Sequence, residues 1–431
     1  MTAVLQVALD MMHLKRALAI GKEAVEGGAD WVEAGTPLLK SEGAEAIRAL
    51  RKAFPGRTLV ADMKTMDVGA FEVEIAVKAG ADVITVLGLA DDGTISESVL
   101  TARKYGAKVM VDLINVPDKV ARGEEVVALG AEYVCLHVGI DEQMHGRGSH
   151  VDMVRKVASA LRVPVAVAGG INQSNAHEYV KAGASIVIVG GAIIKAEDVR
   201  KAARDVRKAM LSGAKGRKTI SRKYSQDELA EAFSKVSTPN IADAQHKRGV
   251  MAGIVPHIAH AQKMVGQALT VQTAKGDWAK PVEAIDKAKR GDVIVIDAGG
   301  SDVGVWGELA SLSAQLKGVQ GVVIDGAARD IETILEIGFP CFSKHVVPHA
   351  GEPKGHGGIG QEIMCGGQLV RTGDWVIGDE NGVVVVLQET AVEIANRAMD
   401  VLERENRIRE EIRRGGTLSS VQELEKWEQV R

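Results

Sequence analysis

The sequence predicts an α/β protein made of an eight-stranded parallel barrel, a (β/α)8 fold, followed by a second and different α/β domain. The chain has 431 residues, which is more than a single hydrophobic core usually serves. Its first half repeats a short apolar run followed by a stretch with helical spacing, and this repeat stops near residue 211. With 46% hydrophobic and 26% charged residues, the composition is that of an ordinary globular protein.

Short apolar runs divide the first 211 residues into eight units. Buried parallel strands that alternate with helices produce this rhythm, and eight units favour a closed barrel over an open sheet. The runs are VLQVALD from Val4, WVEAGT from Trp31, TLVADMK from Thr58, DVITVLG from Asp82, KVMVDLI from Lys108, YVCLHV from Tyr133, PVAVAGG from Pro164 and SIVIVGG from Ser185. Glycines that end a helix in a left-handed conformation are expected before several strands. They are Gly28, Gly80, Gly106, Gly130 and Gly183.

Residues 212–228, SGAKGRKTISRKYSQDE, are interpreted as a linker between one domain at 1–211 and another at 229–431. The segment combines Gly, Ser and five basic residues without an apolar period. After it come a helix, a strand-rich middle that includes GDVIVIDAGG and GVVIDGAARD, and a final helix. The eightfold rhythm does not continue, so a different α/β domain is expected.

The charge and the cysteine content indicate which binding partners and which cellular compartment to expect. The net charge of -4 gives no bulk attraction to nucleic acid or to an acidic membrane, which leaves small molecules as the expected substrates. The three cysteines form no CxxC pair, and buried thiols in a reducing cytoplasm are expected. No apolar run reaches the roughly 18 residues that a membrane span needs, so we expect a cytoplasmic protein without a membrane partner.

Polar residues gather where the predicted strands end. In VADMKTMD, residues 60–67, Asp62 and Lys64 are two positions apart and therefore share one face of the third strand. Barrel enzymes place their active sites at this end of the strands. The ends of other strands carry Asp10, Glu33, Asp112 and His137. These residues are predicted to form a catalytic site, and a solvated ring of salt bridges is the alternative.

Two glycine pairs close the seventh and eighth strands, Gly169-Gly170 and Gly190-Gly191. Barrels commonly bind a substrate phosphate there through backbone N–H groups. The pairs therefore predict a phosphorylated sugar as substrate, although tight turns alone would also require glycine.

The motif Asp62-Met-Lys64-Thr-Met-Asp67 resembles the DxKxxD motif of the orotidine-monophosphate decarboxylase superfamily. The segments EAGTPL and AGGI are similar to its 3-hexulose-6-phosphate synthase branch, and the resemblance covers nearly all of residues 1–210. It implies Mg²⁺ (or Mn²⁺) held by Glu33 and Asp62, Lys64 beside the developing charge, and His137 as proton carrier. It also implies a homo-oligomer, at least a dimer, in which Asp67 reaches a neighbouring subunit's site.

The implied reaction is the aldol interconversion of formaldehyde and D-ribulose 5-phosphate with D-arabino-3-hexulose 6-phosphate. It passes through an enediolate, which a divalent metal and a lysine stabilise while a histidine moves a proton. A 3-keto-gulonate-6-phosphate decarboxylase of the same superfamily would use nearly the same groups and is the alternative. Those relatives usually have an arginine shortly after the histidine, whereas His137 is followed by Val138, Gly139 and Ile140, which favours the synthase.

The second half contains a charged pair at the end of an apolar segment, GVVIDGAARD. Twenty residues separate Glu308 from the pair Arg329-Asp330. An arginine suits a carboxylate or enolate through paired N–H donors, and an adjacent aspartate suits Mg²⁺. An internal ion pair between Arg329 and Glu308 is the structural alternative.

This spacing resembles the D-x20-R-D signature of the class II pyruvate aldolases in the RraA-like family, with Glu308 in place of the first Asp. The resemblance covers about residues 235–388 and implies a swivelling β/β/α fold, a metal at Asp330, catalytic roles for Glu308 and Arg329, and an α-keto acid substrate. The family also contains regulators that bind proteins, so a regulatory or assembly module is the alternative.

Overall fold

The computed structural model describes residues 3–139, 151–212, 223–422 and 424, and it divides into two compact units. The barrel unit contains Met1–Lys223 and Glu403–Arg431, and the second unit contains Tyr224–Leu402. Most of the predicted linker, residues 213–222, lies outside the described residues. The last three linker residues form a short 3-10 helix, η1 (Gln226–Glu228).

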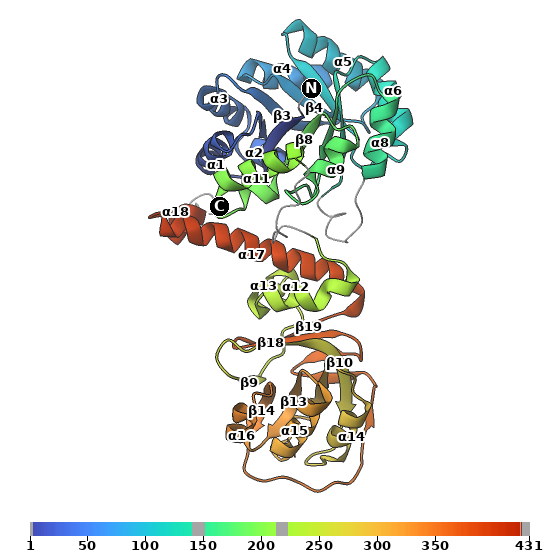
Figure 1. Ribbon diagram of the computed structural model, residues 1–431, viewed down its shortest axis with the longest axis vertical. Coiled ribbons are helices and arrows are strands. Elements are labelled where there is room, and N and C mark those ends of the chain that lie inside the picture. The colour runs from blue at the N-terminus through green and yellow to red at the C-terminus, as the bar shows by residue number, and fades with distance from the viewer. Residues whose placement is uncertain (1–2, 140–150, 213–222, 423, 425–431) are drawn as a thin grey trace. The chain divides into compact units, whose positions relative to one another are not determined.

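The barrel unit confirms all eight strands predicted for the first half (Figure 1). They close into a parallel barrel in chain order, because β1 pairs with both β2 and β8. The strands are β1 (Val4–Leu9), β2 (Trp31–Ala34), β3 (Thr58–Thr65), β4 (Val83–Leu87), β5 (Lys108–Asp112), β6 (Tyr133–His137), β7 (Val165–Ala168) and β8 (Ile186–Val189).

Helices connect the barrel strands, and the five glycines expected before strands all have positive φ, from 77° to 113°. Glycine is favoured there because a Cβ disfavours the left-handed conformation that ends the preceding helix. The helices are α1 (Leu14–Glu26), α2 (Thr36–Glu42), α3 (Ala44–Ala53), α4 (Gly69–Ala79), α5 (Asp92–Lys104), α6 (Lys119–Ala128), α8 (Val151–Ala160), α9 (Ala176–Lys181), α10 (Gly191–Ile194) and α11 (Val199–Ser212).

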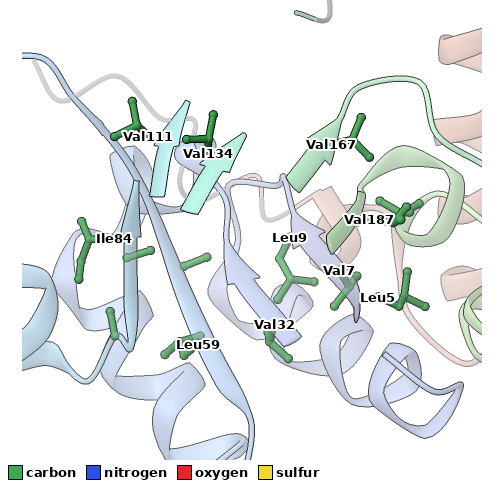
Figure 2. Close-up of a cluster of buried hydrophobic side chains, with 14 of the residues drawn as sticks. Leu5, Val7, Leu9, Val32, Leu59, Ile84, Val111, Val134, Val167 and Val187 are labelled. Carbon is green, nitrogen blue, oxygen red and sulfur yellow. The ribbon is translucent and has the colours of Figure 1, made fainter. Parts of the chain in front are cut away.

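The main core of the barrel unit lies between the strands and the helices. Alternate strand residues such as Leu5, Val7 and Leu9 point outward into this core and are completely buried (Figure 2). Full burial of one such side chain contributes about 1.5–3 kcal/mol. A one-residue slip would exchange the two faces of a strand, so this packing fixes which residues point into the barrel.

The second unit is built on a nine-stranded mixed sheet with the central order β19-β18-β10-β11-β13-β14-β9. The strands β10, β11, β13 and β14 run parallel, and antiparallel strands flank them. The strands are β9 (Val255–His257), β10 (Met264–Gln272), β11 (Asp292–Asp297), β12 (Gly304–Trp306), β13 (Gly321–Ala328), β14 (Cys341–Val346), β15 (Gly358–Ile359), β18 (Trp375–Asp379) and β19 (Gly382–Val386), with a separate hairpin of β16 (Ile363–Cys365) and β17 (Gln368–Val370).

The strands of this sheet are apolar on both sides, because helices cover one face and the other face packs against the β16–β17 hairpin and the segment around Met251. In β13, Val322 and Ile324 belong to one hydrophobic cluster and Val323 belongs to another. The helices of this unit are α12 (Leu229–Lys235), α13 (Thr238–Ala244), α14 (Ala279–Lys287), α15 (Glu308–Lys317), α16 (Ile331–Glu336) and η2 (Gln388–Thr390). The helix α17 (Ala391–Arg413) begins in this unit, and α18 (Leu418–Gln422) belongs to the barrel unit. In the part of the chain that the structure describes, no helix has the length and apolar character needed to cross a membrane.

Candidate functional site

Polar side chains line the inner face of the barrel at the carboxyl ends of five strands. Their outward neighbours, among them Leu9, Ala34 and Val111, are buried in the core, so the alternation of the strands turns the polar residues inward. These residues are Asp10 after β1, Glu33 in β2, Asp62 in β3, Asp112 in β5 and His137 in β6. The structure thus brings together the predicted rim residues of the first half.

The ammonium group of Lys64 bridges strands β3 and β5. Its Nζ donates to both carboxylate oxygens of Asp62, at 3.0 and 2.9 Å, and to Oδ2 of Asp112 at 3.1 Å. The same Asp112 oxygen lies 2.8 Å from Nδ1 of His137. Lysine, two carboxylates and imidazole therefore form one connected chain of charge-assisted hydrogen bonds.

Two threonines that the sequence analysis did not select hold the carboxylate of Asp62. Thr85 Oγ1 donates to Asp62 Oδ1 at 2.7 Å, and Thr36 Oγ1 donates to Oδ2 at 2.6 Å. Thr85 occupies an inward position of β4 and could have been found from the strand alternation. Thr36 begins α2, and only the folded chain brings it to Asp62.

The backbone at Lys64 is strained. Lys64 has φ of 48°, in the left-handed region that residues with a Cβ rarely adopt, and the pairing of β3 with β4 shifts register between Ala61 and Thr65. Such a conformation costs on the order of 1–3 kcal/mol and persists where surrounding contacts hold it. The distortion aims the lysine at Asp62 and Asp112.

The charge states of Lys64 and Asp112 follow from their contacts. Burial alone lowers the pKa of Lys64, but the carboxylates of Asp62 and Asp112 outweigh burial and raise that pKa above its ordinary value. Burial raises the pKa of Asp112, but the hydrogen bond from His137 and the charge of Lys64 outweigh it and lower that pKa. Both groups are therefore ionised at neutral pH.

Glu33 is buried beside other carboxyl groups. Its side chain accepts a hydrogen bond from Nε2 of Gln6, and only 5% of the residue surface is exposed. Burial, followed by repulsion from Asp62 and Asp10, raises the pKa of Glu33 well above its ordinary range. The hydrogen bond from Gln6 and the charge of Lys64 oppose this rise in the pKa but do not cancel it.

The donor set at this end of the barrel fits Mg²⁺. Glu33 and Asp62 offer hard oxygen ligands, and a divalent cation would relieve the repulsion between them. Among the described residues no group of three or more His, Cys, Asp or Glu is placed to hold a metal ion. Mg²⁺ usually takes one or two carboxylates and completes its shell with water or substrate oxygens, so two carboxylates suffice.

Asp10 lies against two glycines. A Cβ at Gly35 would be 2.3 Å from its Oδ1, and a Cβ at Gly190 would be 3.0 Å from its Oδ2. Any larger residue at Gly35 would displace the carboxylate. The predicted phosphate glycine Gly190 therefore also borders the acidic part of the site.

The predicted phosphate glycines form the turns after β7 and β8. Gly169 and Gly170 have φ of 99° and 66°, and Gly191 begins α10. Lys195, one helical turn later, was not predicted from the sequence. Its side chain folds back so that Cε and Nζ would lie 3.6 and 3.7 Å from a Cβ at Gly191, and its charge acts on Asp10. A cation thus stands beside the predicted phosphate position.

Asp67 lies apart from these groups. It is exposed, and its Oδ1 accepts a hydrogen bond from the backbone N–H of Val68 at 2.7 Å. Large apolar residues around it are also exposed, with 52% of Met66, 60% of Val68 and 64% of Phe71 accessible. The end of the DxKxxD segment therefore points out of its own barrel site.

The predicted residues of the second half also meet in space. Glu308, Arg329 and Asp330 all line one cavity of ≈ 540 Å³ in the second unit. Arg329 Nε lies 3.4 Å from Asp330 Oδ2, and the backbone N–H of Glu308 donates to the same oxygen at 3.4 Å. Within the described residues the ion pair of Arg329 is with Asp330 and not with Glu308.

Asp330 adopts a left-handed backbone with φ of 58° at the start of α16. A strained residue between a strand and a helix, beside an arginine and a cavity, is common at ligand sites. With side-chain exposures of 43% and 41%, Arg329 and Asp330 remain accessible to a ligand.

Comparison with known proteins gives two family matches. The model of the orotidine 5'-phosphate decarboxylase / HUMPS family matches residues 3–206, and that of the RraA-like family, described as Aldolase/RraA, matches residues 238–385. The two matches fall on the barrel unit and on the second unit, respectively.

Individual relatives match the barrel over almost their whole length. A 3-hexulose-6-phosphate synthase from Mycobacterium gastri is 44% identical over 206 residues, which are 48% of this chain and 99% of that protein. A protein of the same name from Bacillus subtilis (strain 168) is 39% identical over 209 residues, again 48% and 99%. A crystal structure of a 3-hexulose-6-phosphate synthase is 43% identical with a TM-score of 0.46 and covers 48% of this chain and 99% of its own.

Proposed function

Because the chain belongs through residues 3–206 to the orotidine 5'-phosphate decarboxylase / HUMPS family, we propose that its barrel joins formaldehyde to D-ribulose 5-phosphate and catalyses the reverse cleavage. The chain is an enzyme. The product of condensation is D-arabino-3-hexulose 6-phosphate. The observation that carries the proposal is the connected chain of Lys64, Asp62, Asp112 and His137 at the barrel rim.

The residues of this chain have defined tasks in the reaction. His137 removes a proton from C1 of ribulose 5-phosphate, which gives an enediolate. Because Asp112 accepts the hydrogen of His137 Nδ1, Nε2 is left as the basic nitrogen. C1 then attacks the formaldehyde carbon, and the resulting alkoxide takes up a proton. The ammonium of Lys64 stabilises the negative oxygen in a site from which water is partly excluded.

Mg²⁺ held by Glu33 and Asp62 would supply further positive charge at the enediolate oxygen. Substrate binding uses the turns at Gly169–Gly170 and Gly190–Gly191, where backbone N–H groups bind the phosphate. Asp10 lies between Gly190 and the carboxylates of Glu33 and Asp62, and in this proposal it borders the carbon atoms of the sugar. The enzyme requires Mg²⁺ or Mn²⁺ in this proposal.

The test is formaldehyde-dependent loss of ribulose 5-phosphate by the purified chain. Asp62→Asn and Lys64→Ala should each lower the rate about 10²-fold or more, because each removes a group that stabilises developing charge. Lys52→Ala, an exposed lysine at the end of α3, serves as the control and should retain the parental rate. Near-normal turnover in a folded Lys64→Ala protein would disprove the assignment.

A 3-keto-gulonate-6-phosphate decarboxylase is the second candidate for the barrel. It would need the same lysine, carboxylates and histidine. The residues after His137, Val138 and Gly139, supply no arginine, and this favours the synthase. Release of carbon dioxide from the keto-gulonate phosphate, without formaldehyde-dependent turnover, would favour the decarboxylase over the synthase.

For the second unit we propose a Mg²⁺-dependent site for an α-keto acid with aldolase or decarboxylase activity. Arg329 would bind the carboxylate, Asp330 would hold the metal, and Glu308 would act on a proton or a metal-bound water. Calorimetry on the full chain should show Mg²⁺-dependent binding of pyruvate or oxaloacetate that Asp330→Ala abolishes. The absence of heat from both acids would instead favour a regulatory or assembly module.

A further inference from the structure

The cavity of the second unit is lined by both charged and apolar side chains. Arg329 and Asp330 provide charged lining, where β13 passes into α16. Apolar lining comes from Trp278 just before α14, from Val282 in α14 and from Leu309 in the first turn of α15. A ligand that fills this cavity must therefore match both kinds of surface.

The apolar wall is held in place and remains accessible. The indole N–H of Trp278 donates to the carbonyl oxygen of Gly351 at 2.9 Å, which fixes the ring at the edge of the cavity. Val282 and Leu309 keep 38% and 75% of their surfaces exposed. Exposed apolar side chains that converge on a cavity beside an arginine provide a surface for an apolar group of a ligand.

The size of the cavity exceeds what a small keto acid needs. At ≈ 540 Å³ it falls in the range of sites that enclose much larger ligands. Pyruvate on Arg329 would leave the wall at Trp278 and Leu309 in contact with water. A substituent on the methyl carbon of the keto acid could instead cover this wall.

The charges along the cavity select against a second carboxylate on that substituent. Among the described residues that line the cavity, three are acids, Glu308, Asp330 and Glu352, and one is a cation, Arg329. One carboxylate can pair with Arg329, and one metal ion can neutralise Asp330. A further carboxylate would face the remaining acids without a partner.

We propose that the second unit binds an α-keto acid with an uncharged, ring-sized apolar substituent, in which Arg329 takes the carboxylate and Trp278, Val282 and Leu309 take the substituent. The inference rests on the proposed keto-acid function of this unit and defines its substrate class. It places an aryl or branched alkyl keto acid ahead of pyruvate itself and of dicarboxylic keto acids.

The test is calorimetry on the full chain with Mg²⁺, using phenylpyruvate, pyruvate and oxaloacetate as probes. Phenylpyruvate should bind with a Kd at least about tenfold lower than pyruvate, because burial of a ring adds apolar contact area. Oxaloacetate should bind no more tightly than pyruvate. Leu309→Ser should weaken phenylpyruvate several-fold and leave pyruvate unchanged, and Arg329→Gln should weaken both.

Leu316→Ser provides a matched control, since Leu316 is on the same helix, is 77% exposed and does not line the cavity. It should change neither Kd. Equal affinity for phenylpyruvate and pyruvate, or equal effects of Leu309→Ser and Leu316→Ser, would overturn the inference and leave the keto-acid function standing. Failure of all three acids to bind would overturn that function as well.

Discussion

At the scale of single residues, the neighbouring carboxylates of the barrel site favour the charged form of Lys64 and disfavour the charged form of Glu33. Lys64 gains two carboxylate partners, which raise its pKa and keep it charged. Glu33 is buried among acids, which raises its pKa and disfavours its charged form. The site therefore holds a carboxylate at an energetic cost that a bound divalent cation would offset.

Glu33→Gln is expected to stabilise the metal-free protein. The raised pKa means that the folded state binds this proton more tightly than the unfolded state does. The corresponding stability is fully present below the ordinary glutamate pKa of about 4.3 and is lost as pH rises through the folded pKa. Urea denaturation with EDTA should give a higher midpoint for Glu33→Gln than for the parent at pH 8, and a smaller difference at pH 5.

Glu45→Gln is the control for this experiment, because Glu45 is exposed and forms a surface ion pair with Arg48. It should change the midpoint little at either pH. Glu33→Gln should also lose the formaldehyde-dependent activity. A variant that is less stable than the parent at pH 8 would contradict the electrostatic account of Glu33.

Lys195→Met is expected to raise the KM for ribulose 5-phosphate about tenfold or more with little change in kcat. The side chain of Lys195 lies over Gly191 in the predicted phosphate turn, and hydrogen bonds to charged groups contribute about 1.5–3 kcal/mol. Inorganic phosphate should inhibit this variant more weakly than the parent. Lys181→Met, an exposed position at the end of α9, should change neither constant, and an unchanged KM in Lys195→Met would remove Lys195 from the phosphate site.

At the scale of elements, the end of β3 separates the two halves of the DxKxxD segment. The left-handed backbone at Lys64 and Val68, with φ of 48° and 54°, turns the chain sharply before α4 begins. Asp62 and Lys64 thus stay inside the barrel, while Asp67 and the apolar side chains of Met66 and Phe71 reach solvent. This arrangement suits a segment that contributes to a neighbouring copy.

Mixing two inactive variants tests that arrangement. If Asp67 completes the site of a neighbouring subunit, a dimer of one Asp67→Ala chain and one Lys64→Ala chain contains one intact site. Co-refolded chains should regain part of the parental activity, up to about half per heterodimer. Two tags of different sequence would allow the heterodimer to be purified before assay, and a verified heterodimer without activity would show that each barrel uses its own Asp67.

At the scale of the whole molecule, each unit has its own hydrophobic cores and its own charged site. The barrel cores are formed by residues of the first 210 positions, and the cores of the second unit lie between Tyr224 and Met399. No residue is shared between the cluster around Lys64 and the cavity at Arg329. Substitutions in separate sites without common partners usually act independently.

If the two sites are independent, a substitution in one site should leave the activity of the other unchanged. Arg329→Gln should leave the kcat and KM of the barrel reaction unchanged while keto-acid binding is lost. Lys64→Ala should abolish the barrel reaction while the calorimetric Kd of the keto acid is retained. Loss of both functions in either folded variant would mean that the units communicate and would favour a regulatory role for the second one.

The sequence by itself determined the strands, the glycine turns and the polar rim of the barrel. These features depend on local rules: Glu33 and Asp62 face inward because strand residues alternate, and Gly80 ends a helix because it accepts positive φ. The orientation of Lys64 also needs the left-handed backbone that the folded chain imposes there. A local pattern also identified the charged pair Arg329-Asp330 as a candidate ligand site, since the pair ends an apolar run. Local patterns also carried the family resemblance.

Only the tertiary structure decided which partners complete these sites. Gln6 on Glu33, Thr36 on Asp62 and Lys195 over Gly191 depend on the closure of the barrel and on how each loop returns. The apolar wall at Trp278 comes from a helix about fifty residues before Arg329, and no periodicity connects the two. Strand and turn preferences act over a few residues, whereas the shape and charge of a cavity arise from packing between segments that are distant in the chain.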